Sequence, residues 1–147
     1  MIYILDTDSL IFIIRGLKNP TTSPRRAIAE KVVNKIKRAI DTKNAVGISA
    51  ITKAELKYGI ARADNSEKEQ DALEKILSPF DEYDFDAHEA AKFYGIIRNS
   101  LEKKGQMIGG MDLLIAAHTL SLGAVLISNN LREFSRVPNL VVENWSE

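Results

Sequence analysis

The chain has 147 residues, 45% apolar and 27% charged, with 20 basic and 20 acidic side chains and no cysteine. This length predicts a single domain, residues 1–147, and the absence of cysteine excludes a disulfide framework and a thiolate metal site. A net charge of zero argues against a generic nucleic-acid-binding protein, which would be basic. The N-terminal apolar stretch lacks a basic n-region and no apolar run could span a bilayer, so we expect a cytoplasmic protein without a membrane partner.

Charge is unevenly distributed along the chain. Residues 15–43 contain nine Lys or Arg and two acids, whereas residues 64–89 contain ten acids and two Lys. The simplest interpretation is two solvated helix faces. The alternative is an edge that faces a polyanion, balanced by an acidic flank elsewhere.

The N-terminal third predicts one strand and two helices. "IYIL" (2–5) is β-branched and aromatic, as in a buried strand, and "DSLIFIIRG" (8–16) predicts a short helix that ends at Gly16. Two prolines mark a loop at 17–24, and apolar residues recur with a helical period over 25–40.

The rest of the chain continues this alternation. We expect strands at 45–49, 80–85, 124–128 and 140–143, and helices at 51–63, 66–77, 86–105 and 111–123, the last two ending at Gly105 and Gly123. Strands separated by helices predict an α/β fold in which a parallel sheet is covered by helices on both faces. Functional groups of such sheets gather beyond the carboxyl ends of the strands.

Two acids follow the first predicted strand. Asp6 lies at its end, and Asp8 lies two residues further on. Asp6 could cap the helix that follows, but Thr7 and Asp8 are also good caps and lie nearer the helix start. We therefore expect Asp8 to be the cap, which leaves Asp6 free for another role.

Two further acids lie in predicted helices beside the functional edge, Glu55 in the helix after the strand 45–49 and Asp112 at the start of the helix 111–123, and each has a structural explanation. Thr52-x-x-Glu55 matches a capping box, although Ser49 offers an earlier cap. Asp112 could cap the apolar helix "MDLLIAAHTL" or point into the space beyond the sheet edge. Capping and function are about equally good explanations for each acid alone.

The three acids together favour a metal site. The predicted topology brings Asp6, Glu55 and Asp112 to one edge, where like charges repel unless a cation binds. Oxygen ligands suit Mg²⁺ or Mn²⁺ rather than zinc. Such a site is suited to metal-assisted hydrolysis of a phosphodiester.

Other polar residues near this edge are neutral or have structural explanations. Ser128, Asn129 and Asn130 could ligate weakly, orient a metal-bound water or form a turn. His88 and His118 are expected to be structural. No H-E-x-x-H or G-x-S-x-G motif supports a zinc protease or a serine hydrolase.

Four segments carry a family resemblance and span nearly the whole chain. They are "ILDTDSL" (4–10), "SAITKAELKYGIAR" (49–62), "GGMDLLIAAHTLSLGAVLISNN" (109–130) and "EFSRVPNLVVENW" (133–145). In this order they resemble a PIN-domain endoribonuclease of the VapC toxin type. The resemblance implies a three-layer α/β/α sandwich with a central parallel sheet of four to five strands, and Mg²⁺- or Mn²⁺-dependent cleavage of RNA.

The resemblance also implies site residues. Asp6, Glu55 and Asp112 match the first, second and third acids of the family, with Asp6 and Asp112 as principal metal ligands. A fourth acid is usual in the family, but Asn130 stands at that position, and nearby Glu133 is not expected to replace it. The supporting polar positions are Thr7, Asp8, Ser128 and Asn130.

The resemblance further implies partners. Proteins of this type pair with a small VapB-like antitoxin, which covers the active site and binds operator DNA, and they are commonly homodimers. The predicted helices 8–16 and 25–40 are natural surfaces for both contacts. The residues expected to contact RNA phosphates are Arg15, Lys18, Arg25 and Arg26.

Two other functions remain open at this point. A haloacid-dehalogenase-like phosphatase also has D-x-D after a buried strand, but Leu10 stands where Thr or Val is expected, and no acid pair follows Ser128. A non-catalytic PIN-fold module that binds RNA or protein is the other alternative. Asp6, Glu55 and Asp112 argue against it, whereas Asn130 keeps it open.

Overall fold

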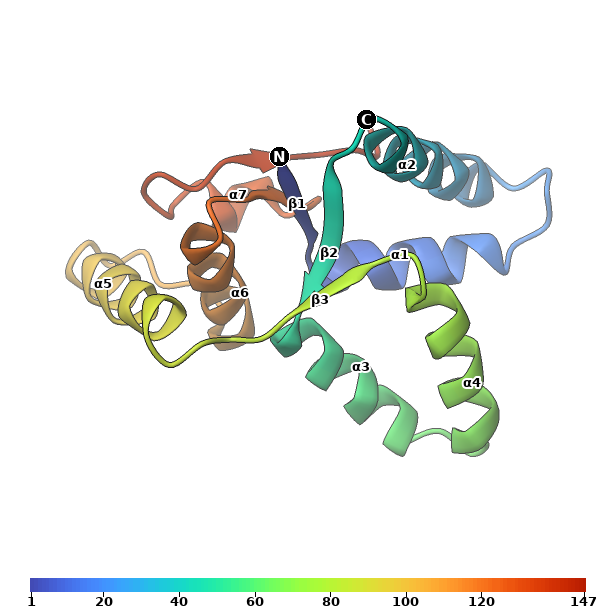
Figure 1. Ribbon diagram of the computed structural model, residues 1–147, viewed down its shortest axis with the longest axis horizontal. Coiled ribbons are helices and arrows are strands. Elements are labelled where there is room, and N and C mark those ends of the chain that lie inside the picture. Colours follow the sequence, from blue (N-terminus) through green and yellow to red (C-terminus); the bar gives the residue numbers. More distant parts are fainter.

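A computed structural model describes all 147 residues as a five-stranded sheet flanked by helices (Figure 1). All strands are parallel, in the order β3-β2-β1-β4-β5. The strands are β1 (Ile2–Leu5), β2 (Ala45–Ser49), β3 (Asp81–Tyr83), β4 (Val125–Ile127) and β5 (Val142–Glu143). The helices are α1 (Thr7–Leu17), α2 (Pro24–Asp41), α3 (Ala50–Ala61), α4 (Ser66–Leu77), α5 (Glu89–Lys103), α6 (Gly110–Ser121) and α7 (Leu131–Phe134).

Helices cover both faces of the sheet, so the expected three-layer α/β/α sandwich is confirmed. In Figure 1, α5, α6 and α7 lie on one side of the strands and α1 to α4 on the other. Adjacent strand residues point to opposite faces, so Ile4 packs into the core under α5 and α6, whereas Leu5 packs into the core under α1 and α2. No helix is both long enough and apolar enough to cross a membrane.

The sheet order reverses at β1, which pairs with β2 on one side and β4 on the other. In parallel sheets this reversal opens a crevice beyond the carboxyl ends of the two diverging strands, because their connections run to opposite faces. Asp6 follows β1 and Ser128 follows β4. The topology therefore places both residues at the crevice.

One predicted helix end is wrong. Gly16 does not stop the first helix, which continues to Leu17. A Cβ atom at Gly16 would lie 2.6 Å from the Cβ of Ala29 in α2, so glycine is required there by close helix packing. Gly105 and Gly123 do follow helix ends, with φ of +64° and +61°, as predicted.

Candidate active site

Asp6 is the most buried acid of the site. Its side chain is 2% exposed, and its backbone N–H donates to the carbonyl of Ile127 in β4. Oδ1 accepts a 2.8 Å hydrogen bond from the backbone N–H of Ser9, and Oδ2 accepts a 2.6 Å hydrogen bond from Ser128 Oγ. Burial nevertheless raises the pKa of Asp6, because its cost to the charged form outweighs these hydrogen bonds.

The same contacts correct one prediction from the sequence. The helix begins at Thr7, so Asp6 and not Asp8 is its N-cap. Asp8 is exposed in the first turn. The N-cap is the residue that directly precedes the helix. The helix starts at Thr7, one residue before the predicted start at Asp8, so Asp6 takes the N-cap position. Asp6 uses one oxygen for the cap and the other for Ser128.

Asp112 is close enough to Asp6 for the charge of Asp6 to raise its pKa. It is the third residue of α6, whose N-cap is Gly109, so it does not cap the helix. The pKa of Asp112 is raised to about 7 by burial, by the charge of Asp6, and by the hydrogen bond and charge of Glu133, with a smaller effect of Asp8. The acids that the structure brings together are therefore Asp6, Asp112, Glu133 and, at the rim, Asp8.

Glu133 acts on Asp112 more directly than its sequence position predicts. Asn130 is the N-cap of α7, and its Oδ1 accepts from the backbone N–H of Glu133 at 3.4 Å. Its Nδ2 donates to Glu133 Oε2 at 3.1 Å, and its own backbone N–H donates to Ser128 Oγ. Asn130 thus orients the acid beside Asp112. Its capping spacing, Asn130-x-x-Glu133, was the signal in the sequence that could have identified this role.

Glu55 reaches the site through Thr7. Ser49 is the N-cap of α3, so the capping-box explanation of Glu55 is wrong. Thr7 Oγ1 donates a 2.6 Å hydrogen bond to Glu55 Oε1 and lies 3.0 Å from Thr52 Oγ1. Glu55 is therefore linked to the site through the hydroxyl of Thr7.

Comparisons with known proteins place this site in a family. The PIN domain family model matches residues 3–140. The chain belongs to the PIN-domain family. It is 37% identical over 147 residues to ribonuclease VapC2 of Rickettsia felis, covering 100% of both chains. It is 35% identical over 144 residues to the tRNA(fMet)-specific endonuclease VapC of Shigella flexneri, covering 98% of both.

Solved structures agree with these sequence matches. The VapBC2 complex of Rickettsia felis, bound to a DNA fragment from its promoter, superposes with a TM-score of 0.83 and 37% identity over 99% of each chain. The PIN domain described here is thus a VapC-type ribonuclease, as its sequence indicated, and the phosphatase alternative has no support among these relatives.

PIN-domain ribonucleases generally use divalent metal ions. The donors at this site fit such an ion, because they are carboxylate oxygens and two of them, on Asp6 and Asp112, disfavour each other's charge. No three His, Asp or Glu side chains are arranged as a complete metal cage.

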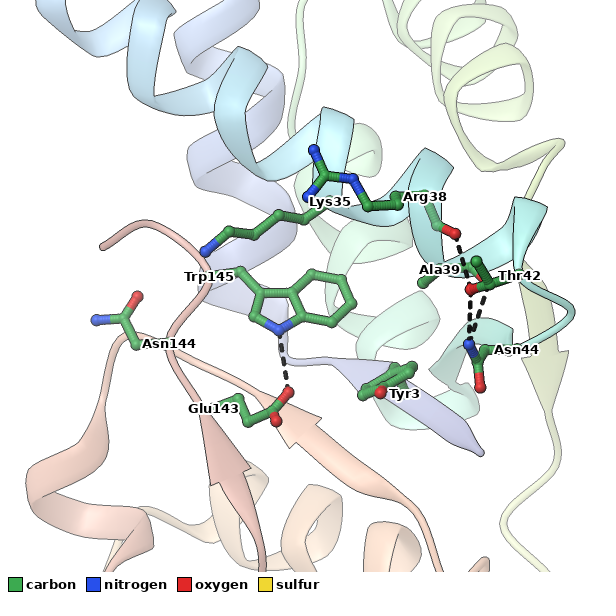
Figure 2. A pocket seen from close by; sticks show the side chains of 9 residues that line it. All are labelled: Tyr3, Lys35, Arg38, Ala39, Thr42, Asn44, Glu143, Asn144 and Trp145. Atoms are coloured by element: carbon green, nitrogen blue, oxygen red, sulfur yellow. Dashed lines mark hydrogen bonds between the residues drawn. The ribbon is translucent and has the colours of Figure 1, made fainter.

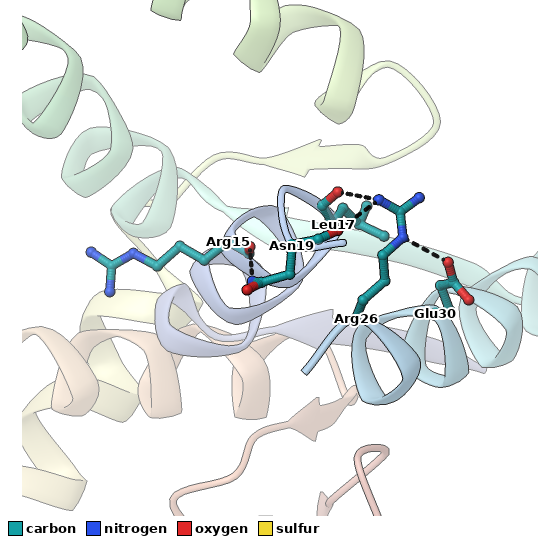
Figure 3. A network of polar contacts seen from close by, with 5 residues as sticks. All are labelled: Arg15, Leu17, Asn19, Arg26 and Glu30. Atoms are coloured by element: carbon teal, nitrogen blue, oxygen red, sulfur yellow. Dashed lines mark hydrogen bonds and ion pairs between the residues drawn. The ribbon is translucent and has the colours of Figure 1, made fainter. Parts of the chain in front are cut away.

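The four basic residues predicted to contact RNA differ in their surroundings. Arg26 Nε pairs with Glu30 at 2.9 Å, and its Nη1 donates to the carbonyls of Leu17 and Asn19 (Figure 3). Arg26 therefore closes the turn between α1 and α2. Arg15 points away from this network in Figure 3, and the side chains of Arg15, Lys18 and Arg25 make no hydrogen bond or ion pair within the chain.

His118 lies inside the protein, outside the cluster of Asp6, Asp112 and Glu133, and the acids that act on it are Asp84 and Asp86. It is 1% exposed in α6, and its Nδ1 is 2.6 Å from Ser49 Oγ, the N-cap of α3. This contact joins the helix that carries Asp112 to the helix that carries Glu55. Burial lowers the pKa of His118, and its Nε2 has no hydrogen-bond partner.

Proposed function

We propose that this chain acts as a single PIN domain, an endoribonuclease that uses Mg²⁺ or Mn²⁺, which Asp6 and Asp112 would hold, with Glu133 beside Asp112 and Glu55 oriented by Thr7. The observation that carries the proposal is the gathering of acids around the buried Asp6, whose two oxygens are held by Ser9 and Ser128. Burial and the charges of Asp6 and Glu133 raise the pKa of Asp112 to about 7. A bound divalent ion relieves this repulsion. When bound, it supplies a polarised water and positive charge beside the transferring phosphate.

The chain's own residues position the reacting groups. Ser9 and Ser128 hold both oxygens of Asp6, so its carboxylate keeps one orientation. Asn130 holds Glu133 beside Asp112. Thr7 holds Oε1 of Glu55, whose Oε2 has no partner and is our candidate to accept a proton from the attacking water. We infer that Asp8, Thr7, Ser128 and Asn130 support the site without reacting.

We propose RNA as the substrate because the site suits a phosphodiester and relatives named above are ribonucleases, one of them specific for tRNA(fMet). A cavity of about 390 Å³ runs from Asp8 along α1 and is bordered by Arg15 and Arg25. Their unpaired guanidinium groups can bind the phosphates that flank the cleaved bond. Lys18 lies further along the same helix, whereas Arg26 is already held by three oxygens.

We also propose an antitoxin of the VapB type as a protein partner, because several structural relatives are VapBC complexes. An apolar groove of about 280 Å³ lies between α1, α3 and α4, with Glu55 at its wall. Its apolar side chains include Ile11, Ile14 and Ile60. An amphipathic segment with a basic anchor would fill this groove and cover Glu55. The predicted contact on helix 25–40 is not part of it. We further propose a homodimer and a cytoplasmic location, where such a partner and RNA meet.

The deciding experiment is cleavage of RNA by the purified chain, with its antitoxin removed, in Mg²⁺, Mn²⁺ or EDTA. We expect cleavage that requires a metal ion and is lost, by at least a hundredfold, in Asp6→Asn and Asp112→Asn. Equal cleavage by all three proteins would refute the proposed mechanism. Hydrolysis of a small phosphate monoester without RNA cleavage would instead favour a phosphatase.

A further inference from the structure

An open groove of about 610 Å³ lies between α2 and the segment that follows β5 (Figure 2). It contains none of the acids assigned to the metal. Figure 2 shows Lys35 and Arg38 extending from α2 above an aromatic floor made by Tyr3 and Trp145. No function described above uses this groove.

The floor is a pair of aromatic rings. Tyr3 and Trp145 have ring centroids 5.0 Å apart and an interplanar angle of 54°, and both side chains are half-buried, so each ring leaves part of its surface at the groove. Trp145 Nε1 donates a 3.0 Å hydrogen bond to Glu143 Oε2, which holds the indole in one orientation. A fixed, partly exposed indole is a platform on which a nucleobase can stack.

Two cations stand above this platform on one face of α2. Lys35 donates only to the carbonyl of Glu147, at 3.2 Å, and the guanidinium of Arg38 has no partner. At the end of the groove, Asn44 Nδ2 donates to Ala39 and Thr42, which leaves Oδ1 free to accept. Aromatic surface, mobile cations and a free amide oxygen are the groups that bind bases and phosphates of a single strand.

The groove approaches the acid site at Trp145. The same indole lines a cavity of only about 10 Å³ together with Ser9 and Asn129. Ser9 holds one oxygen of Asp6, and Asn129 follows Ser128, which holds the other. Trp145 therefore lies close to the residues that orient Asp6.

We propose that this groove binds single-stranded RNA next to the cleaved bond, with a base stacked on Trp145 and phosphates paired with Lys35 and Arg38. This inference rests on the proposed function, because the groove is assigned to the same substrate. It adds a subsite that lies outside the metal centre. Glu143 lines the groove and holds the indole through its hydrogen bond to Trp145.

Trp145 is the only tryptophan of the chain, so its fluorescence reports directly on this groove. The experiment is titration of the protein with a 12-nucleotide single-stranded RNA in EDTA, which keeps the RNA intact. We expect saturable quenching of Trp145, weakened about tenfold by the double variant Lys35→Glu/Arg38→Glu, with a shallower dependence on salt. Lys37→Glu, a charge reversal on the opposite face of α2, is the matched control and should bind as wild type does.

Cleavage assays keep this inference distinct from the proposed function. With Mg²⁺ or Mn²⁺, the double variant should raise the KM for the 12-nucleotide RNA about tenfold and leave kcat within a factor of about three. Cleavage by wild type without quenching at saturating RNA would overturn the subsite and leave the nuclease intact. Quenching without cleavage would do the reverse. Equal quenching by duplex DNA, or an equal loss in Lys37→Glu, would show general charge attraction and would also overturn the subsite.

Discussion

The hydroxyl of Thr7 donates a 2.6 Å hydrogen bond to Oε1 of Glu55, across 48 positions of sequence. Thr7 opens α1 directly after Asp6, and Glu55 lies one turn into α3. The hydroxyl of Thr7 therefore holds the start of α1, next to Asp6, against Glu55 on α3. The contact between Ser49 and His118 holds the start of α3 against α6.

Replacing Thr7 with Val keeps the side chain's shape and removes its hydroxyl. We expect kcat for RNA cleavage to fall about ten- to a hundredfold, because residues that orient a reacting group typically matter by that factor. The free energy of unfolding should fall by about 1 kcal/mol, the usual contribution of one buried hydrogen bond. Thr7→Ser, which retains the hydroxyl, is the control, and near-wild-type cleavage by Thr7→Val would contradict the role assigned to this contact.

Asp112→Asn should make the metal-free protein more stable at neutral pH. The pKa of Asp112 is raised to about 7, so its contribution to stability is complete below pH 4 and is lost as pH rises through 7. The amide carries no charge, so above pH 7 the variant should exceed wild type by about 1–2 kcal/mol after allowance for solvent screening. Urea unfolding in EDTA at pH 4 and pH 8 measures this difference.

In EDTA at pH 8 we expect Asp112→Asn to be more stable than wild type. Added Mg²⁺ or Mn²⁺ should make wild type the more stable protein, because an ion that binds only the folded state stabilises that state. Asp64→Asn, which removes an exposed acid from the turn before α4, controls for the change in net charge. If Asp112→Asn is no more stable than wild type at pH 8 in EDTA, burial and the neighbouring acids do not destabilise the charged form of Asp112, and the prediction is refuted.

Glu133→Gln tests whether Glu133 takes the place of the missing fourth acid. The variant removes a charge that raises the pKa of Asp112, so that pKa should fall. It also removes an oxygen anion beside the metal, so we expect the dissociation constant for Mn²⁺, measured by calorimetry, to rise about tenfold. Glu67→Gln, at an exposed position of α4, is the control and should leave the dissociation constant for Mn²⁺ unchanged. If Glu133→Gln binds Mn²⁺ as tightly as wild type does, Glu133 does not contribute to metal binding.

His118 should make the protein sensitive to mild acid. Burial lowers its pKa in the folded state, so the unfolded chain binds a proton first, and stability is lost as pH falls below about 6.5 towards the folded pKa. His118→Asn can keep a hydrogen bond to Ser49 and does not titrate. Asp112 gains its proton over the same range in both proteins and stabilises both equally, so we expect the unfolding free energy of wild type to fall between pH 7 and pH 5 relative to that of His118→Asn.

His118→Leu separates this effect from the link between helices. It also does not titrate, but it leaves Ser49 without its partner, so kcat for RNA should fall further than in His118→Asn. Equal kcat in the two variants would show that the Ser49–His118 contact does not position α6 against α3.

Most of the fold could be predicted from local patterns. The strands at 2–5 and 45–49 are short, apolar and β-branched, and the helices between them have apolar residues at helical spacing. Alternation of these elements allows few topologies, so a parallel sheet with covered faces followed directly. The helix boundaries were less predictable, and Gly16 shows why, because close packing against Ala29 rather than a helix end explains that glycine.

The sequence by itself determined the chemistry of the candidate site, since Asp6 is an acid at a strand exit of a parallel sheet and Asp112 is an acid at the start of an apolar helix. Only the tertiary structure decided how these acids are paired. Asp6 is both helix cap and buried acid, Glu133 instead of Asn130 supplies the neighbouring charge, and Trp145 closes a groove against Tyr3. The physical reason is that desolvation and the distances between charges depend on contacts made across the sheet, which no local pattern of residues contains.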